Sequence, residues 1–227
     1  MSGHGKRYRS SLEAQPVPGA PLPIPQAVAV LRKYKPAKFD ETVELSMRLG
    51  IDPKQADQLV RGSFSMPRGL GKTVRVIVFA GDAAAKEARD AGALEVGGDD
   101  LIKKVAEGWL DFDVAVAHPE MMAKVGRLGK VLGPQGKMPS PKSGTVTPKV
   151  GEAVKAFQAG KIEYRNDDSG NLHVPVGKRS FPDDALVENL KAFSGHILAN
   201  RPAGVKGTFL HGAAISLTMS PSVKVVL

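Results

Sequence analysis

The sequence predicts a chain with two α/β parts: a split α+β domain with an antiparallel sheet, and an inserted α/β domain with a parallel sheet. Residues 42–49 alternate between polar and apolar side chains, which is typical of a strand buried on one face only. Residues 74–80 are almost all apolar, as expected of a strand covered on both faces, and alternating strands and helices follow. Further along the chain the one-sided pattern returns. We therefore expect residues 1–66 and 158–227 to form the split domain and residues 67–157 the insert.

The N-terminal part begins with a basic cluster and a proline-rich segment. The cluster consists of Lys6, Arg7 and Arg9. It forms either a solvated helical turn or a basic arm that lies on phosphate. The prolines of residues 15–25 exclude a helix or a central strand and predict a stiff polyproline II connector. Apolar residues at helical spacing then predict a helix over residues 27–34, with Pro25 in its first turn.

Within the insert, segments of strand and helix composition alternate, which is the pattern of βαβ units around a parallel sheet. Strands are expected over residues 74–80, 94–96 and 113–117. Helices are expected over residues 83–91, 99–109 and 151–158, and from residue 119. The pair Asp99-Asp100 opens one of these helices, where carboxylates complement the positive end of the helix dipole. We interpret this pair as a helix cap rather than a catalytic pair.

The second piece of the split domain contains a turn, a long helix and several strands. Asp167-Asp168-Ser169-Gly170 is a strong turn signal between expected strands at 161–165 and 171–176. Residues 181–199 have an apolar stripe at helical spacing, and Asp183-Asp184 caps this expected helix. Further strands are expected over residues 205–210, 213–219 and 223–226. The chain crossings between the domains, near Met66-Pro67 and Gly160, are expected to form a hinge.

The composition limits the classes of function. There are 32 Lys and Arg residues against 23 Asp and Glu, a formal net charge of +9, which predicts an anionic partner such as nucleic acid, an acidic protein or a membrane surface. The absence of cysteine excludes a disulfide scaffold, a cysteine-ligated zinc site and a thiol nucleophile. No apolar run approaches the ~18–20 residues of a membrane helix, and no signal peptide is evident. We therefore expect a soluble, cytoplasmic protein without a membrane partner.

The sequence contains no recognisable catalytic or metal-binding constellation. Residues 69–73 resemble the end of a phosphate-binding loop, but Met66 stands where that loop needs glycine, and a strand follows it. The histidines form no ligand pair, and no serine has a triad context. We therefore expect no cofactor, no metal and no small-molecule substrate. Two other classes stay open: an enzyme that uses the insert as a nucleotide site, although residues 78–84 contain a single glycine, and a DNA-binding protein or general nucleic-acid chaperone.

Two regions combine residue types that suit RNA. Residues 38–42 and 216–220 place small hydroxyl side chains near the apolar Phe39 and Met219, a combination that packs on a nucleotide and hydrogen-bonds its 2′-OH. The alternative is that these side chains only fill the solvent face of a sheet. Residues 126–147 are rich in glycine, proline and lysine, and such a long irregular stretch is either functional or disordered. A cationic, glycine-rich loop can hold phosphates.

Four blocks of the sequence resemble the L-one family of large ribosomal subunit proteins, in family order and over almost the whole chain. The blocks are residues 37–72, 126–148, 161–182 and 206–223, of which GRLGKVLGPQGKMPSPKSGTVTP is the second. The resemblance implies a split α+β domain and an inserted Rossmann-like, three-layer domain that binds no dinucleotide. It also implies a cytoplasmic ribosomal protein that binds the large-subunit ribosomal RNA of the mobile stalk beside the tRNA exit site. Assistance in the release of deacylated exit-site tRNA, and repression of its own messenger RNA through an rRNA-like site, are implied as well.

The resemblance further implies which residues contact RNA. The main surface is matched by Lys38, Phe39, Glu41, Thr42, Ser216, Thr218, Met219 and Ser220. Neighbours of that surface are Lys6, Arg7, Arg165, His173, Lys178, Lys206 and Thr208. A secondary contact with RNA or tRNA is implied for Lys130, Gly133, Gly136, Lys137 and Pro139. The chain departs from the family pattern at Ser220, Leu217, Gly212 and Asp168, where glycine, threonine, serine and lysine respectively are frequent.

Overall fold

The chain is a mixed α/β protein, as predicted, and its computed structural model describes residues 5–15 and 19–227. It divides into two units. Unit 1 comprises Met1–Arg61, Met66–Gly71 and Tyr164–Leu227, and unit 2 comprises Gly62–Ser65 and Lys72–Glu163. Boundaries between the units fall inside β3 (Arg61–Ser65) and β7 (Lys161–Arg165), which pair as a two-stranded sheet. β3 is not predicted by the sequence pattern, because its residues show neither strict alternation nor a continuous apolar run.

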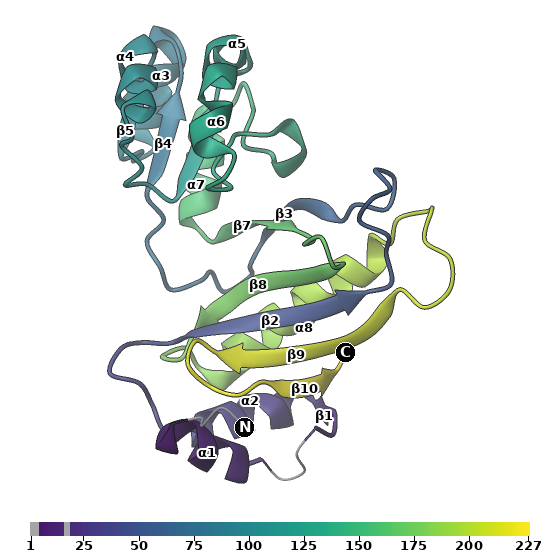
Figure 1. Cartoon of the computed structure of the whole chain (residues 1–227). Helices are drawn as coiled ribbons and strands as arrows, with labels where there is room; N and C mark the ends of the chain where they lie inside the picture. Colours follow the sequence, from purple (N-terminus) through teal and green to yellow (C-terminus); the bar gives the residue numbers. More distant parts are fainter. Residues whose placement is uncertain (1–4, 16–18) are drawn as a thin grey trace. The chain divides into compact units, whose positions relative to one another are not determined.

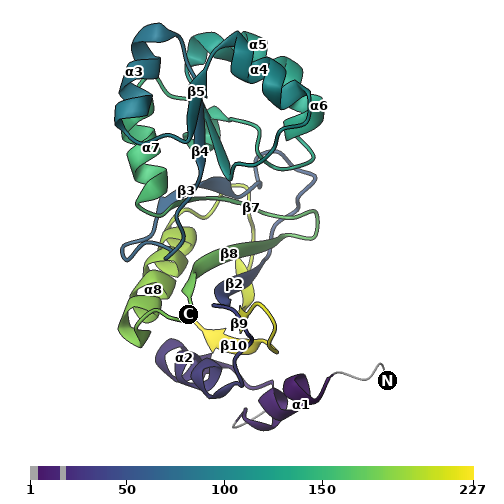
Figure 2. The same cartoon turned by 90° about the vertical axis from the view of Figure 1, so that its left-hand side faces the viewer.

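Unit 1 is built on a five-stranded sheet in the order β1-β10-β9-β2-β8. Its strands are β1 (Leu22–Pro23), β2 (Thr42–Leu49), β8 (Asn171–Lys178), β9 (Leu210–Leu217) and β10 (Val223–Val226). β2 pairs antiparallel with both β8 and β9, and β1 pairs parallel with β10. Figures 1 and 2 show that the helices α2 (Ile24–Lys33) and α8 (Asp183–Ala199) lie on one face of this sheet.

The alternation in β2 decides which face of this sheet is buried. Val43, Leu45 and Met47 are almost completely buried, whereas the residues between them are exposed or half-buried. Val43 lines a small internal gap together with Val28 of α2 and Leu186 of α8. Complete burial of such an aliphatic side chain stabilises the fold by roughly 1.5–3 kcal/mol relative to leaving it exposed. The predicted strand at 42–49 is therefore confirmed, and its apolar half forms the core of unit 1.

The N-terminal and proline-rich segments fold differently from part of the prediction. The basic cluster lies in the helix α1 (Lys6–Glu13), in line with the helical alternative. Residues 22–23 form the edge strand β1 and residues 24–25 begin α2, so the polyproline II prediction for 15–25 was wrong there. An edge strand tolerates proline because the N–H on its outer side has no sheet partner to lose. The prediction for residues 16–18 lies outside the described residues.

The C-terminal strands also differ from the prediction. The strand expected at 205–210 is absent except for Leu210, and the strand expected at 213–219 begins and ends earlier. β9 runs from Leu210 to Leu217 along β2, with an irregularity of register between Arg48 and Leu49. Thr218 and the two residues after it therefore form a turn, not the end of a strand. The turn at residues 167–170 is present, with Gly170 N donating to Asp167 O at 3.2 Å. The two sides of this turn pair only briefly, through an isolated antiparallel bridge between Asn166 and Leu172, because β7 pairs with β3 and β8 pairs with β2.

Unit 2 contains a three-stranded parallel sheet in the order β5-β4-β6, as the alternating pattern predicted. Its strands are β4 (Val76–Phe79), β5 (Glu95–Gly97) and β6 (Val114–Ala117). Helices α3 (Asp82–Asp90) and α7 (Val150–Gln158) pack on one face, and α4 (Asp99–Ala106), α5 (Met122–Val125) and α6 (Gly129–Leu132) lie on the other, as Figure 2 shows. β4 is buried along its whole length, which explains its continuous apolar sequence.

The glycine- and lysine-rich segment of residues 126–147 is not one irregular loop, so that prediction was wrong in part. Besides α6, it contains the 3-10 turns η2 (Gly126–Leu128) and η3 (Pro141–Ser143), and η1 (Pro119–Met121) precedes it. Leu128 and Leu132 are buried in the core of unit 2. Because they are four residues apart, one helical face buries both of them, which offsets the weak helix propensity of the glycines. Among the described helices, none has the length and apolar composition needed to cross a bilayer.

Candidate nucleic-acid interface

The turn that follows β9 is fixed against the beginning of β2. Thr42 N donates to Thr218 Oγ1 at 3.0 Å, and Thr218 N donates to Thr42 O at 3.1 Å. Met219 in this turn and Phe39 just before β2 are 54% and 53% exposed. We call the set formed by these two segments the turn surface. It consists of Lys38, Phe39, Thr42, Thr218, Met219 and Ser220.

Glu41 lies beneath the turn surface and not on it. Its side chain was expected to contact RNA, but the residue is only 1% exposed. Met219 N donates to Glu41 Oε1 at 3.3 Å, while Ala37 N and Arg179 Nη1 both donate to Oε2 at 3.2 Å. The carboxylate is therefore consumed by protein donors. We reassign Glu41 from contact residue to support of the turn, a role that sequence position alone did not distinguish.

Helix α1 reaches the same turn from the other side. Arg7 Nη2 donates to the carbonyl oxygen of Met219 at 3.0 Å, so that both backbone groups of Met219 are held by charged side chains. Lys6 beside it is exposed. Ser220 N donates to Leu217 O at 3.0 Å and closes the turn with a negative φ at Ser220. The geometry therefore does not require the glycine that is frequent in the family at this position.

The polar face of the five-stranded sheet continues the turn surface. Lys178 Nζ donates to Thr42 Oγ1 at 2.8 Å, and Ser46 Oγ lies 3.0 Å from His173 Nδ1. Lys178 and His173 were both predicted as neighbours of the RNA surface, and the pairing of β8 with β2 brings them to it. The predicted Ser216 is half-buried on β9.

Three further side chains lie on this face that were not predicted as site residues, namely Glu44, Ser46 and Arg48. They alternate with the buried residues of β2, so the period of two that predicted the strand already placed them on the polar face. In the sheet, Glu44 stands between Pro175 of β8 and Ser216 of β9. Local alternation does not identify which strands lie beside β2, so it could not show that these side chains share a face with Lys178 and His173.

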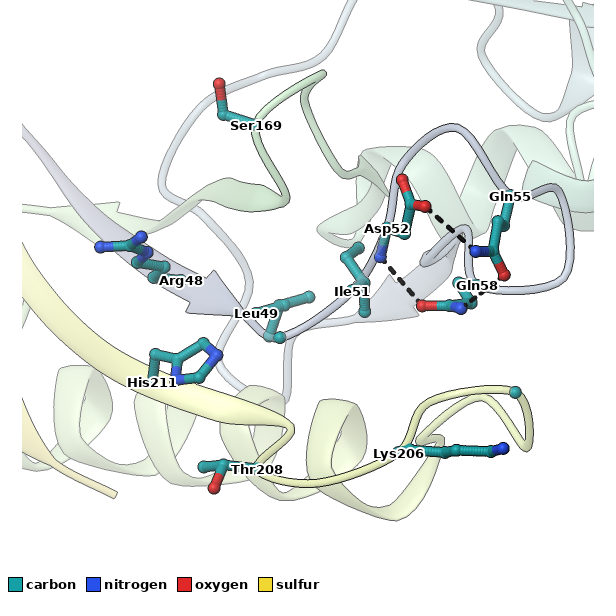
Figure 3. A pocket seen from close by; sticks show the side chains of 12 residues that line it. Arg48, Leu49, Ile51, Asp52, Gln55, Gln58, Ser169, Lys206, Thr208 and His211 are labelled. Atoms are coloured by element: carbon teal, nitrogen blue, oxygen red, sulfur yellow. Dashed lines mark hydrogen bonds between the residues drawn. The ribbon is translucent and has the colours of Figure 1, made fainter.

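A polar pocket of about 730 Å³ opens where β2 ends and β9 begins (Figure 3). Lys206, Thr208 and His211 line one side, and Arg48 lies at the sheet end. Opposite them, Gln58 Oε1 accepts from Asp52 N at 2.9 Å and Gln55 Nε2 donates to Asp52 Oδ2 at 3.1 Å, which fixes the other wall. The pocket thus offers two cationic side chains, Arg48 and Lys206, beside a hydrogen-bonded rim. Two of the predicted neighbours, Lys206 and Thr208, belong to it.

The predicted secondary contacts all lie in unit 2 and differ in accessibility. Lys130, Gly133 and Gly136 are exposed. Lys137 Nζ donates to the carbonyl oxygens of Leu110 and Phe112 at 2.9 and 2.7 Å, so its charge is bound within the unit. Pro139 is buried and is therefore not a surface contact. Arg165 is exposed at the end of β7.

The electrostatics of unit 1 are mixed, because acidic groups border the basic ones. Hydrogen bonds from the backbone and side chain of Asn171 hold the pKa of Asp167 below its ordinary value, so this carboxylate stays ionised near His173. Asp168 is exposed in the same turn, where the family frequently has lysine. In the described part of the chain, no group of three or more histidine and acidic side chains is placed to hold a metal ion.

Comparison with known proteins identifies close relatives. The family model described as "Ribosomal protein L1p/L10e family" matches residues 31–221. The protein named "Large ribosomal subunit protein uL1" from one strain of Thermus thermophilus is 48% identical over 226 residues, which cover 99% of this chain and 98% of the relative. The protein of the same name from a second strain of Thermus thermophilus has the same identity and coverage. The resemblance seen in the sequence blocks thus extends over the whole chain.

Proposed function

Because the chain belongs to the ribosomal protein L1p/L10e family, we propose that unit 1 binds the ribosomal RNA of the mobile stalk through the turn surface and the polar sheet face. Membership in this family makes the chain a structural component of the large ribosomal subunit and not an enzyme. Its location is therefore the ribosome, in the cytoplasm, and its partner is large-subunit ribosomal RNA.

The observation that carries this proposal is the rigid support of an exposed turn. Glu41 and Arg7 hold the two backbone groups of Met219, while the Met219 side chain itself remains 54% exposed. Holding the backbone of a residue whose apolar side chain stays in solvent brings no stability by burial. It does preorganise a contact for a flat partner such as a ribose or base, with the neighbouring hydroxyl of Thr218 within reach of a 2′-OH. Lys38 and Lys6, both exposed, supply charge for phosphates.

The polar sheet face and the pocket extend the proposed contact beyond the turn surface. Arg48 and His211 line both the pocket and a smaller depression over the second half of β2 and the first half of β9. The two depressions are therefore continuous along the sheet. We propose that the RNA follows this track from the turn surface to Lys206, with phosphates on the cationic side chains.

Two finer functions follow from the same proposal. A messenger RNA that folds like the stalk site would occupy the same turn surface, so binding the protein's own messenger and binding ribosomal RNA exclude each other. Unit 2 supports a contact with exit-site tRNA, and such a contact would help deacylated tRNA to leave. Its exposed basic residues include Arg127, Lys130 and Lys142. Both functions are proposals for this chain.

A binding competition tests the proposed function. The full chain is titrated at one salt concentration against folded stalk ribosomal RNA, a messenger leader of similar fold, an unrelated structured RNA and duplex DNA. We expect the first two to compete with each other and to bind at least ~100-fold more tightly than the last two, a difference of about 2.7 kcal/mol. Equal affinity for all four would contradict the proposal and favour a general nucleic-acid chaperone.

A further inference from the structure

A buried ion pair lies directly beneath the turn surface. The side chains of Glu41 and Arg179 are only 2% and 16% exposed, and Arg179 Nη1 lies 3.2 Å from Glu41 Oε2. Removing two charges from water costs several kcal/mol, and a well-packed apolar pair is often equally stable. Stability alone therefore gives a weak reason for this pair. Its hydrogen bonds suggest a stronger one.

Arg179 connects the end of a helix to Glu41. Its Nη2 donates to the carbonyl oxygen of Tyr34 at 2.6 Å and to that of Arg32 at 3.2 Å. These carbonyls lie at the C-terminal end of α2, where backbone oxygens lack partners within the helix and the dipole favours a cation. A guanidinium can serve this helix end and a carboxylate at the same time because its donors form a planar fork, which an ammonium group lacks.

Glu41 joins Arg179 to the turn, because its two carboxylate oxygens accept from different partners. While Oε2 accepts from Arg179, Oε1 accepts from the backbone N–H of Met219 at 3.3 Å. The chain of contacts therefore runs from the buried helix α2, through Arg179 and Glu41, to the residue that presents its side chain to solvent. Both terminal nitrogens of Arg179 already donate to protein oxygens.

From this geometry we infer that Arg179 is a positioning residue for RNA binding: it acts through Glu41 to hold the turn of Thr218 and Met219 in the conformation that RNA recognises. The inference rests on the proposed function of the turn surface. It assigns an effect on RNA affinity to a side chain that does not itself contact RNA. The carboxylate alone, without its guanidinium partner, would be a buried unpaired charge and would draw water or move.

The first test compares Arg179→Met with Arg68→Met in the full chain. Arg68 forms an exposed ion pair with Glu188 at 2.7 Å. Its replacement by methionine therefore changes the net charge by the same amount, but at an exposed site. We expect Arg179→Met to lower the affinity for stalk ribosomal RNA about tenfold, and Arg68→Met less than about twofold. The dependence of binding on salt should keep its slope in Arg179→Met, because a lost phosphate contact would reduce that slope by about 0.7–0.9.

The second test is a double-mutant cycle with Met219→Ala. If Arg179 acts through the turn, Arg179→Met should cost less than about twofold in affinity when Met219 is already alanine. An equal loss in both backgrounds, or a reduced salt slope, would overturn the inference and make Arg179 a direct contact. Equal binding by Arg179→Met and Arg68→Met would overturn it as well.

Two controls separate the possible failures. If Arg179→Met does not fold, Arg179→Lys keeps the charge but not the fork, and wild-type affinity in that folded variant would contradict the inference. Hydrogen exchange of the Met219 amide, followed by NMR without RNA, should be faster in the Arg179 variants than in Arg68→Met. If the wild-type chain does not prefer stalk RNA, the proposed function is wrong. If the Met219 amide exchanges at the same rate in the Arg179 variants and in Arg68→Met, Arg179 does not hold the turn, whatever the RNA result.

Discussion

Met219 and Phe39 are large apolar side chains that the fold leaves more than half exposed. Single exposed apolar residues are common on proteins, so exposure by itself says little. At Met219, however, Glu41 and Arg7 fix the backbone on both sides. An exposed side chain on a backbone that is held in place suits a binding contact.

The first prediction concerns the two residues of the turn. Met219→Ala should weaken binding of stalk ribosomal RNA by ~1–3 kcal/mol through lost packing, with almost no change in the melting temperature. Thr218→Ala should weaken binding similarly but also cost ~1 kcal/mol of stability, because Thr218 Oγ1 accepts from Thr42 N at 3.0 Å. Thr218→Ser keeps that acceptor and serves as the control.

Calorimetry and fluorescence anisotropy measure the two quantities separately. A large fall in melting temperature for Met219→Ala, with unchanged affinity in the folded fraction, would show that Met219 belongs to the core and not to the interface.

At the scale of elements, the junction between β2 and the pocket loop depends on one close approach. A Cβ added at Gly50 would lie 2.2 Å from the carbonyl oxygen of Thr208 and 2.8 Å from His211 Nε2. Backbone at that distance has to move, so the wall of the pocket and the beginning of β9 would shift. Glycine is needed here for close approach and not for an unusual φ.

We therefore predict that Gly50→Ala destabilises the chain by about 1–3 kcal/mol. Gly212→Ala on the neighbouring β9 is the matched control, because a Cβ there meets nothing within 4 Å. Urea denaturation of both variants measures the difference. Equal stability of Gly50→Ala and wild type would mean that the loop after β2 yields freely.

The end of α8 gives a prediction on pH. Tyr164 Oη lies 2.9 Å from His196 Nε2, and burial lowers the pKa of His196 below its ordinary value of 6.5. Because the unfolded chain takes up this proton at higher pH than the folded one, the contribution to stability is complete above pH 6.5. It is lost as pH falls from there through the lower folded pKa.

The free energy of unfolding, measured in urea at pH 7.5 and pH 5, should therefore fall more for wild type than for His196→Gln. His173→Gln, whose side chain is 58% exposed, is the comparison variant. An equal fall for wild type and His196→Gln would show that His196 is as well solvated in the folded state as in the unfolded one.

On the scale of the whole molecule, each unit has a core of its own. Phe79 and its neighbours fill the core of unit 2, and Phe193 of α8 is completely buried in unit 1. The turn surface, the polar sheet face and the pocket are all formed by unit 1. A substitution that destabilises unit 2 should therefore leave the affinity for RNA almost unchanged.

Phe79→Ala should destabilise unit 2 by ~3–5 kcal/mol and leave the affinity for stalk ribosomal RNA within about threefold of wild type. Phe193→Ala removes a side chain of the same size from unit 1 and should lower both stability and RNA binding. Differential scanning calorimetry and RNA titration of the two variants check this. If Phe79→Ala abolished RNA binding while unit 1 stayed folded, unit 2 would hold a main part of the interface.

Several features of this molecule follow from the sequence alone. The alternation over residues 42–49 predicted the strand β2 and its two faces, and the apolar run of residues 74–80 predicted the buried strand β4. Local periodicity has this power because it records which side of an element is buried. The blocks that match the family identified the chain over most of its length, and the basic surplus indicated an anionic partner.

Other features were decided only by the tertiary structure. Leu22–Pro23 became a strand through β10, and Leu128 and Leu132 formed helical turns through the core of unit 2. Glu41 belongs beneath the turn surface because Arg179 and Met219, both distant in sequence, supply its donors. The physical reason is the same in each case: periodicity is a local property, whereas the partner of a polar group or of a short strand is chosen by the packing of segments far apart in the chain.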